Sequence, residues 1–311
     1  MSSPVASTST PPPAAFDPAD LDSVNAELAN AKPQEILAWA IDHIPNLYQT
    51  TAFGLTGLAA TDMIANISRR RKLPHLVPMI FIDTLYHFDE TIRLKEKVEK
   101  KYKLEVIVYR PPGVNSVKEF EEKYGEKLWE TDEDTYDYLV KARSLAMVEP
   151  ARRSYDELNV KAVITGRRRS QGADRAALQP IEIDSTGLVK VNPLCRWGFN
   201  EVKDYVDMAG VPYNSLLDEG YKSIGDWHST VKPKEGESER SGRWASNKQK
   251  SECGLHKDYF VMKRAFEKKQ REQERAAVDK ARGDDAVGET SVDLGTAEDL
   301  GASFSDLKLG A

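Results

Sequence analysis

The sequence predicts an α/β fold built on a mostly parallel, Rossmann-like sheet, and two observations support this. Short runs rich in β-branched and aromatic residues alternate with helical stretches, which is the pattern of βαβ units. Small and basic residues gather directly after several of these runs, where a strand turns into a helix. In parallel sheets such loops lie together at the carboxyl edge, so we expect a ligand to bind there.

Six strands and five helices are predicted from hydrophobic periodicity. The strands are Leu47–Phe53, Val77–Asp83, Glu105–Tyr109, Lys161–Thr165, Leu178–Ile183 and Leu188–Val191, the last two forming a turn-linked pair. The helices are Pro33–His43, Leu58–Arg71, Asp89–Tyr102, Ser144–Leu158 and Asn200–Met208. Parallel strands joined by helices are covered on both faces.

Composition divides the 311 residues into four segments. Residues 1–20 are rich in Ser, Thr, Pro and Ala, resemble neither a secretory nor a transit signal, and are expected to be disordered. Residues 21–230 form the α/β domain that carries the ligand site. Residues 231–262, with few apolar side chains, are expected to be a mobile arm, and 263–311 a charged helix followed by an acidic, disordered tail.

Charge and cysteine content exclude several classes of protein. A formal net charge of −6 argues against general nucleic-acid binding. No apolar run approaches the roughly 20 residues of a membrane span, so a soluble, cytoplasmic protein is expected. The two cysteines, Cys195 and Cys253, are too few for a disulfide scaffold and lack the spacing of a four-ligand zinc site. No metal is predicted.

Two loops after predicted strands are typical of a phosphate site. Small residues in Phe53, Gly54, Leu55, Thr56 and Gly57 allow backbone amides to approach an anion at a helix N-terminus, although the glycines also suit a plain tight turn. The other loop consists of a basic run followed by a serine, namely Arg167, Arg168, Arg169 and Ser170. Adjacent guanidiniums in an acidic protein favour a phosphate-rich ligand, with a solvated basic turn as the alternative.

The second strand ends in Asp83 and Thr84, and its loop is expected to share one crevice with the other two. Farther along the chain, Trp227 and His228 are placed either to contact the ligand or to hold the start of the arm.

Cys253 is the candidate nucleophile. It follows the predicted arm, with Gly254 beside it and His256 three positions on, so a thiolate there has access and a neighbouring group that favours it. A Cys-x-x-His zinc half-site is the alternative, but Cys195 has no partner at metal-ligand spacing. Cys195 is expected to pack as a small hydrophobe.

Stretches covering most of residues 30–256 resemble the phosphoadenylylsulfate (PAPS) reductases of assimilatory sulfate reduction, especially the fungal ones. They are TTAFGLTGL (Thr50–Leu58), FIDTLYHFDET (Phe81–Thr91), VEPARR (Val148–Arg153), TGRRRSQGADRA (Thr165–Ala176), VNPLCRWGFNEVKDYV (Val191–Val206), VPYNSLLDEGYKSIGDWHST (Val211–Thr230) and ECGLH (Glu252–His256). The last is the most specific of these motifs.

The resemblance implies a sheet of the adenine-nucleotide α-hydrolase and ATP pyrophosphatase type. Those proteins often carry Ser-Gly-Gly-x-Asp-Ser in the first loop, which this chain lacks, so ATP cleavage is not expected. Related adenylylsulfate (APS) reductases hold an iron–sulfur cluster with four thiolates, and two cysteines cannot build one. By family pattern, cluster-free members prefer the 3′-phosphorylated nucleotide.

The resemblance also implies a reaction. PAPS is expected to bind between the two phosphate loops, with Asp83, Thr84, Trp227 and His228 completing the substrate site. Cys253 takes the sulfur as an S-sulfonate, His256 assists, and thioredoxin or glutaredoxin releases sulfite for cysteine and methionine biosynthesis. Homodimers are frequent in the family. The alternatives are a cluster-free APS reductase, an adenylyltransferase or ATP pyrophosphatase, and a non-catalytic nucleotide-binding redox sensor.

Overall fold

The computed structural model describes residues 14–132, 135–136, 139, 149–172, 175–237, 239 and 241–242, and, nearer the C-terminus, 264, 267–269, 271–272 and 275. The chain divides into two units, Met1–Lys263 and Arg264–Ala311. In the second unit Lys268 and Glu272 lie one helical turn apart, with 3.7 Å between ammonium and carboxylate. All other elements belong to the first unit.

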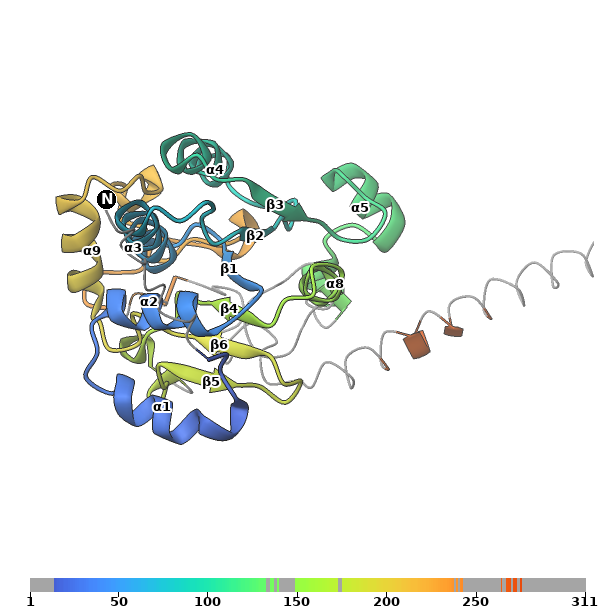
Figure 1. Ribbon diagram of the computed structural model, residues 1–311. Coiled ribbons are helices and arrows are strands. Elements are labelled where there is room, and N and C mark those ends of the chain that lie inside the picture. The colour runs from blue at the N-terminus through green and yellow to red at the C-terminus, as the bar shows by residue number, and fades with distance from the viewer. Residues whose placement is uncertain are drawn as a thin grey trace, which may run out of the picture. The chain divides into compact units, whose positions relative to one another are not determined.

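Strands and helices alternate through this unit (Figure 1). The strands are β1 (Leu47–Thr51), β2 (Met79–Ile82), β3 (Val106–Tyr109), β4 (Ala162–Ile164), β5 (Ile181–Ile183) and β6 (Val189–Val191). The helices are α1 (Leu21–Leu28), α2 (Pro33–His43), α3 (Leu55–Arg71), α4 (Asp89–Tyr102), α5 (Val117–Tyr124), α6 (Leu128–Thr131), α8 (Glu149–Glu157) and α9 (Phe199–Met208). Short 3₁₀ turns are η1 (Pro18–Asp20), η2 (Arg169–Gln171), η4 (Ser215–Leu217) and η5 (Trp227–Ser229).

The six strands form one sheet in the order β3-β2-β1-β4-β6-β5. All neighbouring pairs are parallel except β5 and β6, which pair antiparallel with Glu182 opposite Lys190. The prediction of an α/β fold with a mostly parallel sheet is confirmed, as is the turn-linked pair at its edge. The chain runs outward from β1 to β3 and then returns to β4 on the other side of β1, which makes the β1–β4 boundary a topological switch point.

The sheet is covered on both faces (Figure 1). Helices α2, α3, α4 and α9 cover one face, where Leu37, Met63, Val98 and Val202 belong to the main core cluster. Helix α8 packs on the other face, and a smaller cluster joins its Ala151 to residues of β2, β3 and β4 and to the residue before β6, which are Ile80, Ile82, Tyr109, Val163 and Leu188. Successive side chains of a strand therefore point to opposite faces of the sheet, and both faces carry a buried apolar cluster.

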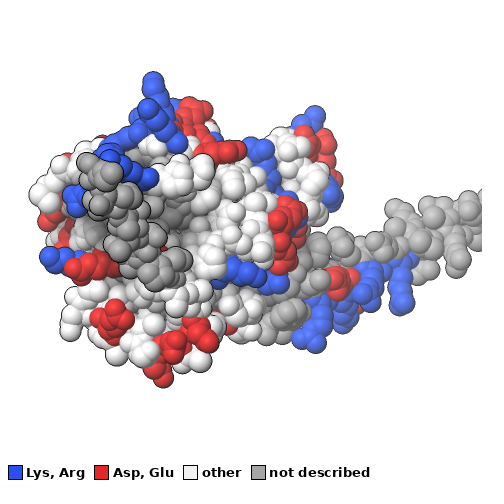
Figure 2. All heavy atoms as spheres, in the orientation of Figure 1, with Lys and Arg blue, Asp and Glu red and all other residues white. Residues whose placement is uncertain are grey.

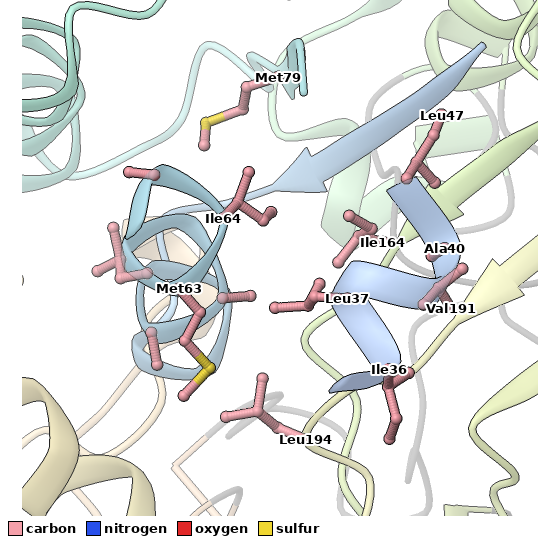
Figure 3. Packing of buried hydrophobic residues seen from close by; sticks show 14 of the residues in the cluster. Ile36, Leu37, Ala40, Leu47, Met63, Ile64, Met79, Ile164, Val191 and Leu194 are labelled. Atoms are coloured by element: carbon pink, nitrogen blue, oxygen red, sulfur yellow. The ribbon is translucent and has the colours of Figure 1, made fainter. Parts of the chain in front are cut away.

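Leu37 of α2 lies in the main core, among α3 and the strands (Figure 3). Because its side chain is 0% exposed, we expect Leu37→Ala to leave a cavity and to lower the free energy of unfolding by about 2–5 kcal/mol. Urea denaturation followed by circular dichroism measures this change. Met208→Ala is the matched control, since that side chain is 83% exposed. An equal loss in the two variants would contradict the packing of α2 on the core.

Two differences from the sequence expectation have local causes. Helix α3 begins at Leu55 and not at Leu58, because Gly54 is the N-cap and its carbonyl oxygen accepts from the Leu58 amide at 3.1 Å. Helix α5 was not anticipated, although Ser116 caps it by accepting from the Glu119 amide at 3.2 Å. Phe120 is the buried side chain of α5, which is too little for a helical hydrophobic pattern.

Basic and acidic side chains are interspersed on the face that Figure 2 shows, over the described residues. In the part of the chain that the structure describes, no helix has the length and apolar character needed to cross a membrane.

Candidate functional site

A cavity of about 160 Å³ lies at the carboxyl ends of β1 and β4, the switch point of the sheet. The loops after both strands line it, with further residues from β6, α8, α9 and the chain beyond α9. From β2 it receives Ile82, the last residue of the strand, whereas Asp83 and Thr84 of the loop after β2 are not among its lining residues. Two of the three loops expected in one crevice therefore meet in this cavity.

The loop after β1 presents the N-terminus of α3 to the cavity. Phe53 has a φ of 54°, a left-handed conformation that is uncommon for a residue with a side chain, and its amide donates to the Thr51 hydroxyl at 2.8 Å. The Phe53 ring is buried against Phe81, with 5.0 Å between ring centroids. This anchored turn directs residues 53–57 along the cavity wall. A 17-residue helix that begins there offers amide donors and a favourable dipole to an anion.

The loop after β4 packs closely on this turn at Gly166. A Cβ atom added to Gly166 would lie 3.2 Å from the Gly57 backbone nitrogen and 3.5 Å from the Thr56 Cβ. A glycine at this position therefore brings the two loops together, and the arginines that follow it come up against the start of α3.

The cavity wall is strongly basic in a protein whose net charge is −6. Among the described residues that line it are five cationic side chains and one acidic side chain, Glu239. The five are Arg167, Arg168, Arg175, Lys190 and Lys222. The first two belong to the basic loop predicted from the sequence. Such a concentration of positive charge in a concave site favours a polyanionic ligand.

Arg167 is buried and anchored toward β5. Its guanidinium donates to the Glu182 carboxylate at 2.5 Å and to the Asn192 side-chain oxygen at 3.1 Å. The Thr165 hydroxyl donates to the same Asn192 oxygen at 2.6 Å. These bonds fix the end of β4 to the β5–β6 pair, so this arginine contributes both charge and rigidity to the wall.

Arg168 is 3% exposed and joins three segments of the chain. Its Nε donates to the Thr56 hydroxyl at 2.9 Å, its Nη1 to the Ser170 hydroxyl at 2.8 Å, and its Nη2 to both carboxylate oxygens of Glu239 at 2.7 Å. Ser170, the last of the four residues predicted in this loop, therefore positions the side chain of Arg168.

Arg169 turns away from the cavity and is not among its lining residues. Its Nε donates to the Leu178 carbonyl oxygen and its amide to the Cys195 carbonyl oxygen, each at 2.7 Å. The three adjacent arginines thus do not form one set, because successive side chains of this turn point in different directions. Of these three arginines, only Arg167 and Arg168 line the cavity.

Trp227 and His228 meet Thr84 in a second cluster, apart from the residues that line the cavity. The Thr84 hydroxyl donates to Asp226 at 2.6 Å, and the Tyr136 hydroxyl lies 3.1 Å from the same carboxylate and 2.8 Å from His228 Nε2. The His228 ring stacks on Trp129, with 4.1 Å between centroids. Of the two predicted roles for this pair, these contacts favour holding the start of the arm.

Asp83 also has a partner outside the cavity lining. Its carboxylate accepts from Arg110 Nε at 2.8 Å and from the Leu85 amide at 2.9 Å. These bonds shape the turn after β2, where Leu85 has a φ of 70°.

Cys253 and His256 lie outside the described residues. Cys195 is described and is 0% exposed, so its prediction as a small buried hydrophobe is confirmed, and burial raises the pKa of its thiol. A buried, protonated thiol is a poor nucleophile. This leaves Cys253 as the candidate for thiol chemistry.

Lys190 is the cavity residue that sequence reasoning missed most clearly. It stands between Val189 and Val191 in a buried strand, and its ammonium lies 2.8 Å from the Asp184 carboxylate. Burial lowers the pKa of Lys190 to about 8, which the attraction of Asp184 only partly offsets. The sequence did carry a signal for this site, namely a single lysine inside an apolar strand. Lysine is rarely buried without a function or a partner.

Comparison with known proteins gives a consistent result. Residues 46–232 match the family described as "Phosphoadenosine phosphosulfate reductase domain". The chain is similar to the phosphoadenosine phosphosulfate reductase of Emericella nidulans, with 51% identity over 79% of this chain and 78% of that protein. It is also similar to the protein of that name from Saccharomyces cerevisiae, with 53% identity over 76% of this chain and 89% of the relative.

Among solved structures, the chain is similar to a phosphate complex of phosphoadenylyl-sulfate reductase from Candida auris. The TM-score is 0.61 and the sequence identity 50%, and the match covers 70% of this chain and 98% of that one.

Proposed function

The chain belongs to the phosphoadenosine phosphosulfate reductase domain family, and on that premise we propose that it reduces PAPS to sulfite and adenosine 3′,5′-bisphosphate in sulfate assimilation. The observation that carries this proposal is the basic cavity at the β1–β4 switch point. PAPS is a polyanion, and five cationic side chains beside a helix N-terminus suit its phosphate groups.

The proposed reaction begins when the Cys253 thiolate attacks the sulfur of bound PAPS. A bond forms between the Cys253 Sγ atom and that sulfur, and the bond from the sulfur to the phosphate oxygen breaks. The departing oxygen carries its electron pair away on adenosine 3′,5′-bisphosphate. Basic residues around the cavity stabilise the charge that develops on this leaving group. Cys253 is left as an S-sulfonate.

The second step needs a dithiol protein, for which we propose thioredoxin or glutaredoxin. Its thiolate attacks the Cys253 Sγ atom, sulfite leaves, and a mixed disulfide forms. The second thiol of the reductant then releases the Cys253 thiol, and the reductant becomes a disulfide. Two electrons have passed from the dithiol to sulfur. We propose no cluster and no bound cofactor for this chemistry, and assign His256 to favouring the thiolate or orienting the S-sulfonate.

Reductant-dependent sulfite release from PAPS, with APS and ATP·Mg²⁺ assayed alongside, tests the function. We expect sulfite from PAPS in the presence of reduced thioredoxin. Sulfite from APS in its place would support a cluster-free APS reductase, and pyrophosphate from ATP would support an ATP pyrophosphatase or adenylyltransferase. Incubation with PAPS and no reductant should leave one S-sulfonate on Cys253, which peptide mass spectrometry detects.

Nucleotide binding should depend on pH through Lys190. Its pKa is lowered to about 8, so the ammonium is present below that pH and is lost as the pH rises through it. A bound polyanion favours the charged form. We therefore expect the affinity for adenosine 3′,5′-bisphosphate to fall as pH rises through about 8, with proton uptake on binding near that pH.

Calorimetry in two buffers of different ionisation enthalpy measures this proton uptake. The double variant Lys190→Met/Asp184→Asn should lack it, because the buried pair is replaced without leaving a lone charge. Lys222→Gln is the control: that exposed side chain also lines the cavity, so affinity should drop while the proton uptake persists. Identical uptake in the double variant would contradict the assignment to Lys190.

A further inference from the structure

Arg168 and Glu239 are 71 positions apart in sequence and form a forked ion pair at the wall of the cavity. Both Glu239 oxygens accept from Arg168 Nη2 at 2.7 Å, and the two side chains are 3% and 13% exposed. A guanidinium buried to this degree requires a counter-charge. Since its other donors hold Thr56 and Ser170, the pair ties the segment around Glu239 to both phosphate loops.

The segment that carries Glu239 is a closed loop. The Val231 amide donates to the Gly242 carbonyl oxygen at 2.8 Å, which joins the ends of residues 231–242. Inside the loop, the Glu237 carboxylate accepts from the Lys234 amide at 2.8 Å and from the Ser241 hydroxyl at 3.1 Å. A Cβ atom on Gly242 would collide with the Val231 carbonyl oxygen, so this closure depends on glycine. The start of the predicted mobile arm is therefore docked at the site.

We propose that Glu239 is a positioning residue, which docks the 231–242 loop on Arg168 and so sets where the chain leading to Cys253 leaves the cavity. This rests on the proposed function. Cys253 lies fourteen positions after Glu239 along the chain, a reach of at most roughly 46–50 Å. The ion pair thus holds the start of this tether at the cavity wall.

Glu239→Ala tests this role, with Glu239→Gln as the conservative variant and Glu235→Gln as the control. Glu235 is an exposed carboxylate of the same loop. At saturating PAPS we expect S-sulfonation of Cys253 to slow in Glu239→Ala by up to about 100-fold, because the reacting groups are misplaced. KM should not rise, since the variant removes a negative charge from the cavity. Glu239→Gln retains one acceptor and should recover part of the rate, and Glu235→Gln should match the wild type.

Limited trypsin digestion gives a readout that does not depend on the reaction. Lys234 is an exposed cleavage site in the loop, so undocking in Glu239→Ala should speed cutting there. If Glu239→Ala bound the nucleotide more tightly and formed the S-sulfonate at the wild-type rate, the proposal would be overturned. Glu239 would then compete with the substrate for Arg168. Cleavage of the Glu239→Ala loop at the wild-type rate would also overturn the proposal. If the wild type forms no S-sulfonate from PAPS, the proposed function fails, while the digestion still decides whether Glu239 docks the loop.

Discussion

Replacing Cys253 with serine should abolish sulfite release from PAPS and leave the affinity for adenosine 3′,5′-bisphosphate unchanged. A serine hydroxyl stays protonated at neutral pH and is a weak nucleophile without an adjacent base, whereas a thiolate is available to attack sulfur. The nucleotide affinity should survive because the basic side chains of the cavity wall are untouched. Sulfite assays with reduced thioredoxin, together with calorimetry of nucleotide binding, measure both quantities.

Cys195→Ala is the matched control for this experiment. Cys195 is the other cysteine of the chain and is 0% exposed. Its variant should still accumulate the S-sulfonate on Cys253 when reductant is withheld. Sulfite production that persists in Cys253→Ser would remove Cys253 from the reaction and favour a redox-sensing role for it.

Arg168→Ala should have the second largest effect, on nucleotide binding. The substitution removes a positive charge from the cavity wall and at the same time leaves the Glu239 carboxylate without its forked partner, so the site becomes less attractive to an anion in two ways. Truncating one member of a desolvated charge pair costs about 2–5 kcal/mol, and the lower value corresponds to roughly 30-fold in Kd.

Three further variants separate the causes of this loss. Arg168→Lys keeps the charge without the fork, so it should restore nucleotide affinity more than the rate of S-sulfonation. Arg168→Ala/Glu239→Ala also removes the carboxylate that has lost its arginine and should regain part of the affinity. Arg93→Ala removes a guanidinium from the surface of α4 and should bind as the wild type does. An unchanged Kd in Arg168→Ala would take this arginine out of the nucleotide site.

Local sequence patterns determined most of the sheet. Runs rich in β-branched and aromatic residues predicted all six strands, and the amphipathic stretches between them predicted the cores of five helices. Alternation with period 2 or 3.6 depends only on neighbouring residues. Helices with a single buried anchor escaped this pattern. Phe120 of α5 and Leu28 of α1 show how little apolar surface such helices present.

The sequence by itself also determined that glycine- and arginine-bearing loops follow β1 and β4, and it predicted Cys253 as the candidate nucleophile. Only the tertiary structure decided which of these groups meet. Arg167 and Arg168 face the cavity and Arg169 does not, because successive side chains of a turn diverge. Lys190 and Glu239 reach the same wall through the order of the strands and the closure of the 231–242 loop. These contacts join residues far apart in the chain, and local periodicity carries no information about them.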